Sequence, residues 1–420
     1  MKFIHAADIH LDSPLRGLER YDGAPVAEIR GATRKALENL IRLSLDENVD
    51  FVLIAGDLYD GDWKDYNTGL FFARQMARLR EAGIPVFLIR GNHDAASQIT
   101  KELKLPDNVH EFSSRKPETV QLDDVGVAIH GQSFSRQAVT EDLSADYPLA
   151  KKGFFNIGLL HTSAGGREGH ENYAPCSVAG LRSKGYDYWA LGHVHQREVL
   201  QEEPWIVFPG NLQGRHARET GSKGCTLVTV VNERVQSVEH RALDVVRWSQ
   251  CLVDASGAAD LDELLERIQR GLRAELDRVQ DRLLAARLVA RGACRASKAL
   301  STQHERFVNE CRALANDLGG GRVWVEKVQL QTRSEVNLDE LAKRFDPVGD
   351  LLRFIRGLAT DEAVLGDLVS EFKDLKQRLP LDLREGIDAI NLDDPGLLRA
   401  LLGDAEQILL PRLLERETPQ

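Results

Sequence analysis

The sequence predicts a four-layer α/β/β/α sandwich, followed by a small α+β module and an acidic helical tail. Five short apolar runs, each typical of a buried strand, end on polar side chains, as expected where strand carboxyl ends meet at one edge of a sheet. Helical segments separate the early runs and extra strands follow later, which indicates two sheets packed face to face with helices outside. The 420 residues also exceed one ordinary hydrophobic core, so further domains are expected.

The first segment, residues 1–240, is expected to hold the sandwich. The five apolar runs occupy residues 3–7, 51–55, 86–90, 157–160 and 188–191. Apolar residues recur with helical spacing between the first three runs, over residues 29–48 and 68–82. Further strands are predicted at residues 119–122, 125–130, 205–208, 225–231 and 234–241.

The second segment, residues 241–333, has a β-α-β-α-β pattern and predicts a small capping module. Its strands are expected at residues 246–253, 282–291 and 323–332, and its helices at residues 261–280 and 302–318.

The third segment, residues 334–420, is expected to be helical and amphipathic. Asp346 followed by Pro347 is typical of an N-cap and a first helical residue, which predicts two helices between residues 338 and 358. Further helices are expected over residues 361–375 and 397–410, the last interrupted at Pro411. The apolar stripe of this tail forms either its own small bundle or a docking surface for a protein partner.

Composition and charge leave the substrate open. The tail holds 19 acidic against 11 basic residues, which is −8 of the net −11, so the remainder is close to neutral and can carry a basic surface. The sequence has no apolar run long enough to span a bilayer. The first run begins at residue 3, leaving no room for a leader, and five scattered cysteines without a C-x-x-C pair are typical of reduced thiols. We therefore expect a cytoplasmic protein without membrane contact.

The residues at the run ends have the chemistry of a two-metal site. The candidate ligands are Asp8, His10, Asp57, Asn92, His161, His193 and His195. Oxygen and imidazole donors without thiolates suit Mn²⁺, Fe²⁺ or Zn²⁺. Seven side chains are too many for one ion and suit two, with Asp57 placed to bridge them. Two such ions about 3.5–4 Å apart can hold a hydroxide and clamp both the attacking and the leaving oxygen of a phosphoryl centre.

His93 adjoins a candidate ligand without being needed as one. We expect it to donate a proton to the leaving alkoxide and to stabilise charge on the phosphorus oxygens. Asp94 is expected to act as a hydrogen-bond partner of the ligands rather than as a ligand.

The order D-x-H, G-D, G-N-H-D, a lone H and G-H-x-H resembles the calcineurin-like metallophosphoesterase superfamily. The segments ADIHLD, AGDLYD, RGNHD, LLHTS and ALGHVH, followed by PGNLQGR, resemble its SbcD and YhaO-like branch of DNA repair exonucleases. The resemblance covers residues 1–240. The family's cap resembles residues 241–333 only in the order of elements, and the tail only by position.

The resemblance implies a ligand set, a substrate and a partner. It implies one metal held by Asp8, His10, Asp57 and His195, and a second held by Asp57, Asn92, His161 and His193. It also implies Mn²⁺ as the usual metal, His93 as catalytic, and hydrolysis of DNA phosphodiesters alongside a separate SbcC-type coiled-coil ATPase. Some nuclease relatives carry a histidine three residues after the bridging aspartate, where this chain has Asp60, so a DNA-positioning role is not expected there.

A glycine-rich turn after residues 205–208 is the expected phosphate contact. Its candidate substrate-binding residues are Asn211, Arg215, His216 and Arg218. Glycines let a backbone approach a phosphate and arginines neutralise one, whereas the alternative is a solvated turn.

Two other functions remain open. One keeps the chemistry but changes the substrate to a small phosphodiester or phosphomonoester, although the roughly 180 appended residues favour a larger substrate. The other is a mainly structural subunit that regulates an ATPase, a role with no use for seven ligands. Association of the chain into a homodimer is also left open.

Overall fold

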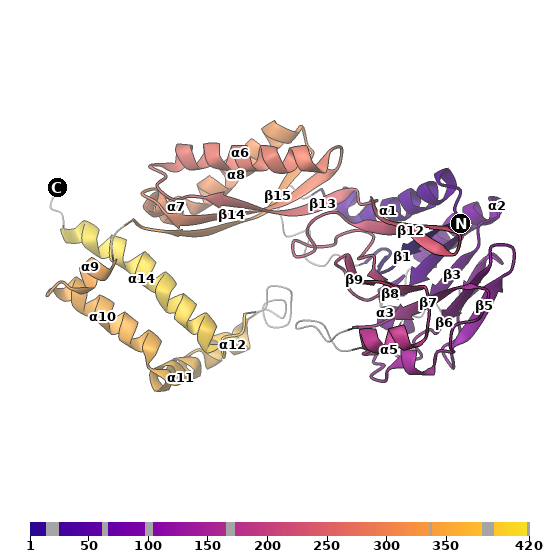
Figure 1. Ribbon diagram of the computed structural model, residues 1–420. Helices are drawn as coiled ribbons and strands as arrows, with labels where there is room; N and C mark the ends of the chain where they lie inside the picture. Colours follow the sequence, from indigo (N-terminus) through magenta and orange to yellow (C-terminus); the bar gives the residue numbers. More distant parts are fainter. Residues whose placement is uncertain are drawn as a thin grey trace. The chain divides into compact units, whose positions relative to one another are not determined.

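The computed structural model describes residues 1–13, 25–60, 66–96, 104–164, 173–335, 338–379 and 390–417 (Figure 1). The chain forms two compact units. The first contains Met1–Gln250, Arg273–Arg287 and Asn316–Lys327, and the second contains Cys251–Leu272, Leu288–Ala315 and the described residues from Val328 on. The division into residues 1–240, 241–333 and 334–420 stays an interpretation of the sequence.

The first sheet of the sandwich carries the first three apolar runs as parallel neighbours. Its strand order is β12-β11-β1-β2-β3-β4, with parallel pairing from β1 to β4 and antiparallel pairing of β11 with β1 and β12. The strands are β1 (Lys2–Ala6), β2 (Phe51–Ala55), β3 (Val86–Ile89), β4 (Val109–Glu111), β11 (Gly224–Val231) and β12 (Arg234–Ala242).

The second sheet carries the other two runs. Its order is β5-β6-β7-β8-β10-β9, in which β6, β7, β8 and β10 are parallel and the two edge strands are antiparallel. The strands are β5 (Glu118–Leu122), β6 (Val127–Gly131), β7 (Phe155–His161), β8 (Tyr188–Gly192), β9 (Glu198–Glu202) and β10 (Trp205–Phe208).

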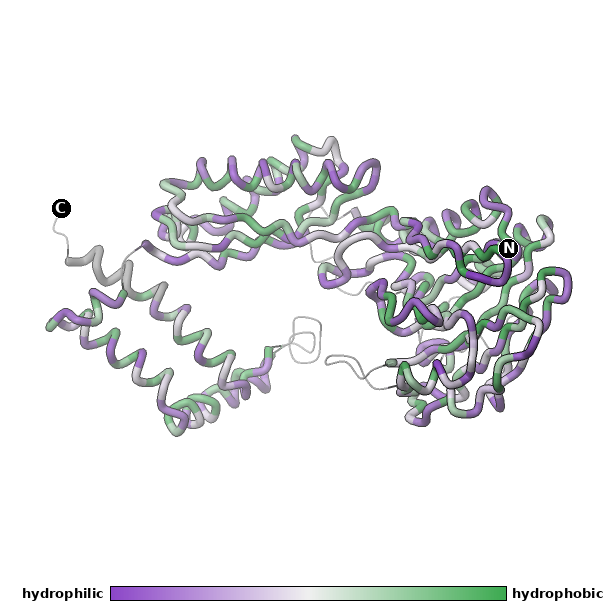
Figure 2. Tube along the Cα trace, viewed as in Figure 1, coloured by the Kyte–Doolittle hydropathy of each residue, from purple (hydrophilic) through white to green (hydrophobic). Residues whose placement is uncertain are grey.

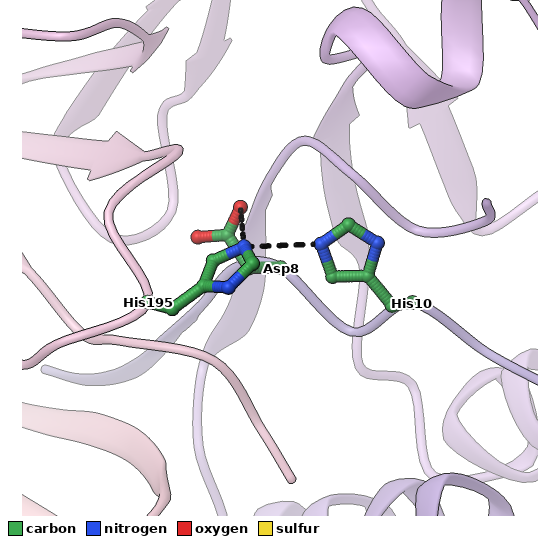
Figure 3. Close-up of side chains that lie close together, drawn as sticks. All are labelled: Asp8, His10 and His195. Carbon is green, nitrogen blue, oxygen red and sulfur yellow. Dashed lines mark hydrogen bonds and ion pairs between the residues drawn. The ribbon is translucent and has the colours of Figure 1, made fainter. Parts of the chain in front are cut away.

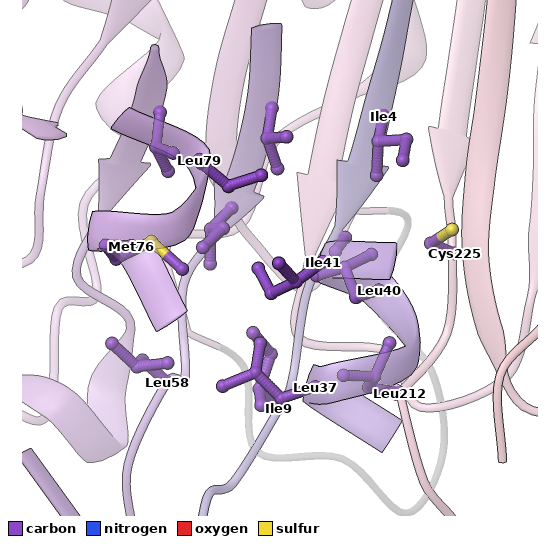
Figure 4. Close-up of a cluster of buried hydrophobic side chains, with 14 of the residues drawn as sticks. Ile4, Ile9, Leu37, Leu40, Ile41, Leu58, Met76, Leu79, Leu212 and Cys225 are labelled. Carbon is purple, nitrogen blue, oxygen red and sulfur yellow. The ribbon is translucent and has the colours of Figure 1, made fainter. Parts of the chain in front are cut away.

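Buried apolar clusters define the predicted four layers. One lies between the sheets, where Phe3 and Phe51 stack at 5.0 Å between ring centroids and Tyr188 meets Phe3 edge-on. A second joins the outer face of the first sheet to α1 (Val26–Asp46) and α2 (Tyr66–Glu81), as Figure 4 shows. A third packs the second sheet against α5 (Val178–Ser183). The α/β/β/α prediction is therefore confirmed.

The β-α-β-α-β pattern forms a three-stranded sheet in the order β13-β14-β15. Its strands are β13 (Val246–Asp254), β14 (Leu283–Ala293) and β15 (Val323–Arg333), joined by α6 (Leu261–Val279) and by α7 (Ser297–Thr302) with α8 (His304–Gly319). Helix α6 packs closely on β13: a Cβ added at Gly271 of the helix would lie 2.9 Å from Cys251 Sγ of the strand.

The tail is a small helical bundle with its own core. Its helices are α9 (Leu338–Ala342), α10 (Pro347–Thr360), α11 (Glu362–Glu371), α12 (Lys373–Arg378) and α14 (Pro395–Glu417). The Asp346 side chain accepts a hydrogen bond from Gly349 N at 2.8 Å, so the predicted helix N-cap is confirmed. Val348 and Leu352 are buried within the bundle. These helices carry both green and purple positions in Figure 2, as expected for helices with one buried face.

The predicted interruption at Pro411 is wrong, because α14 continues to Glu417. A proline removes one hydrogen bond and crowds the preceding turn, which kinks or ends many helices. Here the helix runs on for six further residues.

Candidate metal centre

The candidate ligands lie at the carboxyl ends of β1, β2, β3, β7 and β8 or directly after them. Asp8, His10, Asp57 and His193 have φ values of 50°, 46°, 52° and 107°, in a region that residues other than glycine rarely adopt. Asp8 N donates to Gly56 O and His10 N donates to Asp57 O, each at 3.0 Å, so the first two turns hold each other in place. Backbone strain of this kind concentrates at functional sites.

One group of donors consists of Asp8, His10 and His195 (Figure 3). The Nε2 atoms of the two histidines lie 3.2 Å apart, and His195 Nε2 lies 3.9 Å from Asp8 Oδ1. All three candidate donor atoms lie within 4.8 Å of one another.

The far side of each imidazole meets a carboxylate. His10 Nδ1 lies 2.7 Å from Asp60 Oδ1, and His195 Nδ1 lies 2.7 Å from Glu219 Oε1. A carboxylate at Nδ1 keeps the proton there, which leaves the Nε2 lone pair as an acceptor. Two nitrogen lone pairs that face each other at 3.2 Å repel unless a cation or a proton lies between them. The arrangement of His10 and His195 therefore fits a metal ion.

A second group consists of Asp57, His161 and His193, with Asn92 beside it. His161 Nε2 lies 3.0 Å from Asn92 Oδ1 and 3.4 Å from Asp57 Oδ2, while His161 Nδ1 faces the Ala55 carbonyl at 2.9 Å. Asp57 Oδ2 also lies 4.0 Å from His10 Nε2, so this carboxylate lies between the two groups.

The electrostatics of the centre favour a cation. Burial lowers the pKa of His161, but the Asp57 and Asp8 carboxylates outweigh it and raise the pKa to about 9. In the metal-free protein a proton on this buried imidazole therefore balances the carboxylates, and a divalent ion would replace it. Burial and then Arg215 lower the pKa of His10 to about 4, which keeps this imidazole neutral as a ligand must be.

Two glycines let the turns approach closely. A Cβ at Gly91 would overlap Asp57 Oδ1, and a Cβ at Gly192 would overlap the Ala55 carbonyl oxygen, so only glycine fits at either place. Asp94 is buried and accepts hydrogen bonds from Leu58 N, Tyr59 N and Gly91 N at 2.9–3.1 Å.

His93 lies beside the first group, with its ring edge-on to His10 at 4.9 Å between centroids. Its backbone N donates to Asp57 Oδ1 at 3.0 Å, its Nδ1 lies 3.3 Å from Asp60 Oδ1, and its side chain is 39% exposed. His10, Asp60 and His93 form a third group that could hold a cation. Sequence reasoning treated Asp60 only as a departure from some relatives, whereas the structure shows that it contacts two histidines of the site.

The predicted substrate residues differ in their placement. Asn211 is buried and donates to Gln213 O and to Glu219 Oε2, each at 2.9 Å. Arg215 is 16% exposed and points its guanidinium toward Asp60 and Glu219. His216 is half-buried, and Arg218 is exposed.

Sequence reasoning missed Glu219. Burial opposes its ionisation, but its hydrogen bond with His195 and the charge of Arg215 hold the pKa of its carboxyl well below the usual range. Nothing in the sequence distinguishes this acid from others in loops, because its role depends on a turn that brings it back under His195.

Two family models match the chain. Residues 1–197 match the model described as calcineurin-like phosphoesterase, and residues 248–333 match the model described as the middle domain of metallophosphoesterase YhaO. Among the described residues, none of the helices is both long and apolar enough to cross a membrane.

Three relatives show how far the similarity extends. Metallophosphoesterase YhaO of Bacillus subtilis is 40% identical over 273 residues, which cover 64% of this chain and 67% of that protein. The DNA double-strand break repair protein Mre11 of Methanopyrus kandleri is 26% identical over 311 residues, covering 64% of this chain and 63% of that protein. The protein of the same name from Sulfurisphaera tokodaii is 29% identical over 205 residues, covering 45% and 51%.

The family match over residues 1–197 and the 40% identity to a metallophosphoesterase agree with the order and geometry of the turns described above. The chain therefore belongs to the calcineurin-like metallophosphoesterase family.

Proposed function

We propose that this chain is a two-metal phosphodiester hydrolase that cuts DNA, similar to SbcD. The observation that carries the proposal is the pair of adjoining donor groups on either side of Asp57, with His93 next to the first. A carboxylate shared by two groups of oxygen and imidazole donors matches what two divalent ions require, and a single ion has no use for so many donors.

The ligand assignment follows the two groups. One ion is assigned to Asp8, His10, Asp57 and His195, and the other to Asp57, Asn92, His161 and His193. The oxygen and imidazole donors suit Mn²⁺, with Fe²⁺ and Zn²⁺ as alternatives. Two bound ions would supply Lewis acidity at the phosphorus and lower the pKa of a water between them.

The proton for the leaving oxygen is assigned to His93. Asp60 lies 3.3 Å from its Nδ1, which favours the tautomer with a proton on that nitrogen. Nε2 is then the atom that exchanges a proton with the leaving alkoxide, and the 39% exposure of the side chain lets a substrate reach it.

Two features favour DNA over a small ester. The residues after 240 form a module and a helical bundle that a small substrate does not need. Relatives over much of the chain are named as DNA double-strand break repair proteins. Arg218 and His216 are proposed as phosphate contacts. Asn211 and Arg215 are not carried into the proposal as contacts, because Asn211 is buried and the Arg215 side chain is only 16% exposed and points toward Asp60 and Glu219.

The proposal includes a location and a partner. All five cysteines are buried thiols outside disulfides, which suits the cytoplasm. The tail exposes Phe345 and Phe354 outside its own core, and these are the proposed anchors for a separate SbcC-like coiled-coil ATPase.

A substrate panel tests the proposal. Linear duplex, hairpin and single-stranded DNA, cyclic nucleotides and p-nitrophenyl esters are incubated with the chain and Mn²⁺, with and without a chelator. We expect chelator-sensitive hydrolysis of DNA that exceeds hydrolysis of the small esters. Hydrolysis of small esters alone would make the chain a small-molecule phosphoesterase, and no hydrolysis of any substrate would favour a structural subunit.

A further inference from the structure

Glu219 has the contacts of a residue that fixes another side chain. Its side chain is 7% exposed, and one carboxylate oxygen lies 2.7 Å from His195 Nδ1. The other oxygen accepts from Arg215 N at 2.7 Å and from Asn211 Nδ2 at 2.9 Å. With both oxygens held, the carboxylate has one orientation, and it presents a single acceptor to His195.

Arg215 connects this carboxylate to the one behind the other histidine. Its Nη1 lies 3.5 Å from both carboxylate oxygens of Asp60, and its Nη2 lies 3.4 Å from Glu219 Oε1. Asp60 in turn holds His10 at 2.7 Å. The planar guanidinium therefore lies between two acids that each support one imidazole, and we name these three side chains the Asp60–Arg215–Glu219 bridge.

The surrounding loop builds this arrangement in. Glu219 N donates to His216 O at 2.9 Å, which closes a turn and brings Glu219 back to the backbone of Arg215. Trp248 Nε1 donates to Gly214 O at 2.9 Å and holds the loop from the side of β13. A Cβ at Gly214 would lie 2.8 Å from the Glu219 carbonyl oxygen, so glycine is needed for this close turn.

We propose that Arg215 and Glu219 are positioning residues for one ion of the centre, and that Arg215 does not contact the substrate. The proposal rests on the proposed function, in which His10 and His195 bind that ion. Glu219 sets the tautomer and the angle of His195, and Arg215 keeps Glu219 and Asp60 at matched positions so that both Nε2 atoms face one point.

The charges explain why an arginine is needed there. Asp60 and Glu219 are two carboxylates in a mostly buried space, and the guanidinium reduces their combined charge from −2 to −1. Without it, the two acids would repel each other and move the imidazoles that they hold. Partners of this kind behind metal-bound histidines typically change metal affinity about 10–100-fold when they are removed.

The test measures Mn²⁺ binding to each site of the full chain by calorimetric titration after metal removal. The variants are Glu219→Gln, Arg215→Met and Arg215→Lys, and the matched control is Arg218→Gln, an exposed arginine of the same loop. Thermal unfolding of each metal-free variant is recorded beside it. The salt dependence of duplex DNA binding is measured at saturating Mn²⁺ with His93→Ala added to prevent cutting.

We expect Glu219→Gln and Arg215→Met to lower the affinity for one ion about 10–100-fold and to leave the affinity for the other ion unchanged. Arg215→Lys keeps the charge but loses the two-sided fork, so its effect should be smaller and it should fold even where Arg215→Met does not. Arg218→Gln should bind both ions like the wild type. The slope of log affinity against log salt should not change in the Arg215 variants, whereas Arg218→Gln should lower it by about one.

Two results would overturn the proposal. Normal binding of both ions by the Glu219 and Arg215 variants, with a lower salt slope for Arg215→Met, would make Arg215 a phosphate contact. An equal loss of affinity for both ions, together with a large loss of thermal stability, would mean that the Asp60–Arg215–Glu219 bridge is merely structural. Failure of the wild-type chain to bind two ions would instead contradict the proposed function itself.

Discussion

At the scale of single residues, Asp57 is the side chain on which the two-metal assignment depends. It is buried and lies 3.4 Å from His161 Nε2 and 4.0 Å from His10 Nε2. We expect Asp57→Ala to lose both ions, because each assigned ligand set includes this carboxylate. Elemental analysis of the purified variant gives the metal content. Asp123→Ala, which removes an exposed acid in a turn, is the control and should keep two ions. Two ions retained by Asp57→Ala would exclude the shared carboxylate.

His93 should separate binding from chemistry. It lies beside the candidate ligands but belongs to neither proposed ligand set. The His93→Ala variant should therefore keep its metals and bind DNA, while turnover falls roughly 10²–10⁴-fold. Single-turnover rates with metal content measured on the same sample provide the comparison. His110→Ala, whose histidine pairs with Glu118, is the control. Loss of metal from His93→Ala would make this histidine a ligand, which the third donor group would then explain.

Sequence reasoning found the candidate ligands because each follows directly on an apolar run, and five such endings in order are a strong signal. It did not find Glu219, and it did not see Asp60 as a partner of His10. Both carboxylates act through contacts across the fold, and their distance from the ligands in sequence carries no signal. The sequence likewise does not show whether Arg215 points outward or toward Asp60 and Glu219, since an arginine in a loop has the same letter in both cases.

At the scale of elements, the ends of β2 and β8 lie so close together that no side chain fits at Gly192. A Cβ at Gly192 would overlap the Ala55 carbonyl oxygen and would lie 3.0 Å from His161 Nδ1. We expect Gly192→Ala to lower the free energy of unfolding by about 1–3 kcal/mol or more, because the two strand ends must move apart. Chemical denaturation measures this change.

Gly31→Ala is the matched control for that substitution. Gly31 lies in helix α1, and no atom of the described residues outside the backbone of this helix lies within 4 Å of an added Cβ. Alanine should therefore stabilise the protein by about 0.5–1 kcal/mol. Similar small effects of both substitutions would mean that the strand ends are not in contact as described.

Most elements could be predicted to within a few residues because their apolar spacing is long and regular. Helix α6 was expected over residues 261–280 and spans Leu261–Val279, and β10 matches its predicted bounds. Short elements escaped prediction: β4 and β9 contain few apolar residues, and α3 (Asn92–Ala96) is a single turn that begins at a candidate ligand. The predicted helix over residues 302–318 corresponds to α8, and the pattern gave no sign of the separate short helix α7 that precedes it.

At the scale of the whole molecule, the tail should be dispensable for hydrolysis and needed for a partner. The apolar residues Val348 and Leu352 are used in its own core, so docking would depend on Phe345 and Phe354, which are exposed. We expect a chain truncated after residue 333 to keep Mn²⁺-dependent nuclease activity and to lose co-purification with an SbcC-like protein. The full chain that carries both Phe345→Ser and Phe354→Ser should keep nuclease activity and lose only the binding of the partner. Undiminished capture by both variants would contradict docking through the tail.

The most direct test of the two-metal phosphodiesterase is a titration of the metal-free chain with Mn²⁺ during hydrolysis of a linear duplex. The donor groups on either side of Asp57 are each assigned one ion, so the rate should stay low through the first equivalent and reach its maximum only as the second binds. Full activity at one equivalent, or in the presence of excess chelator, would contradict the account.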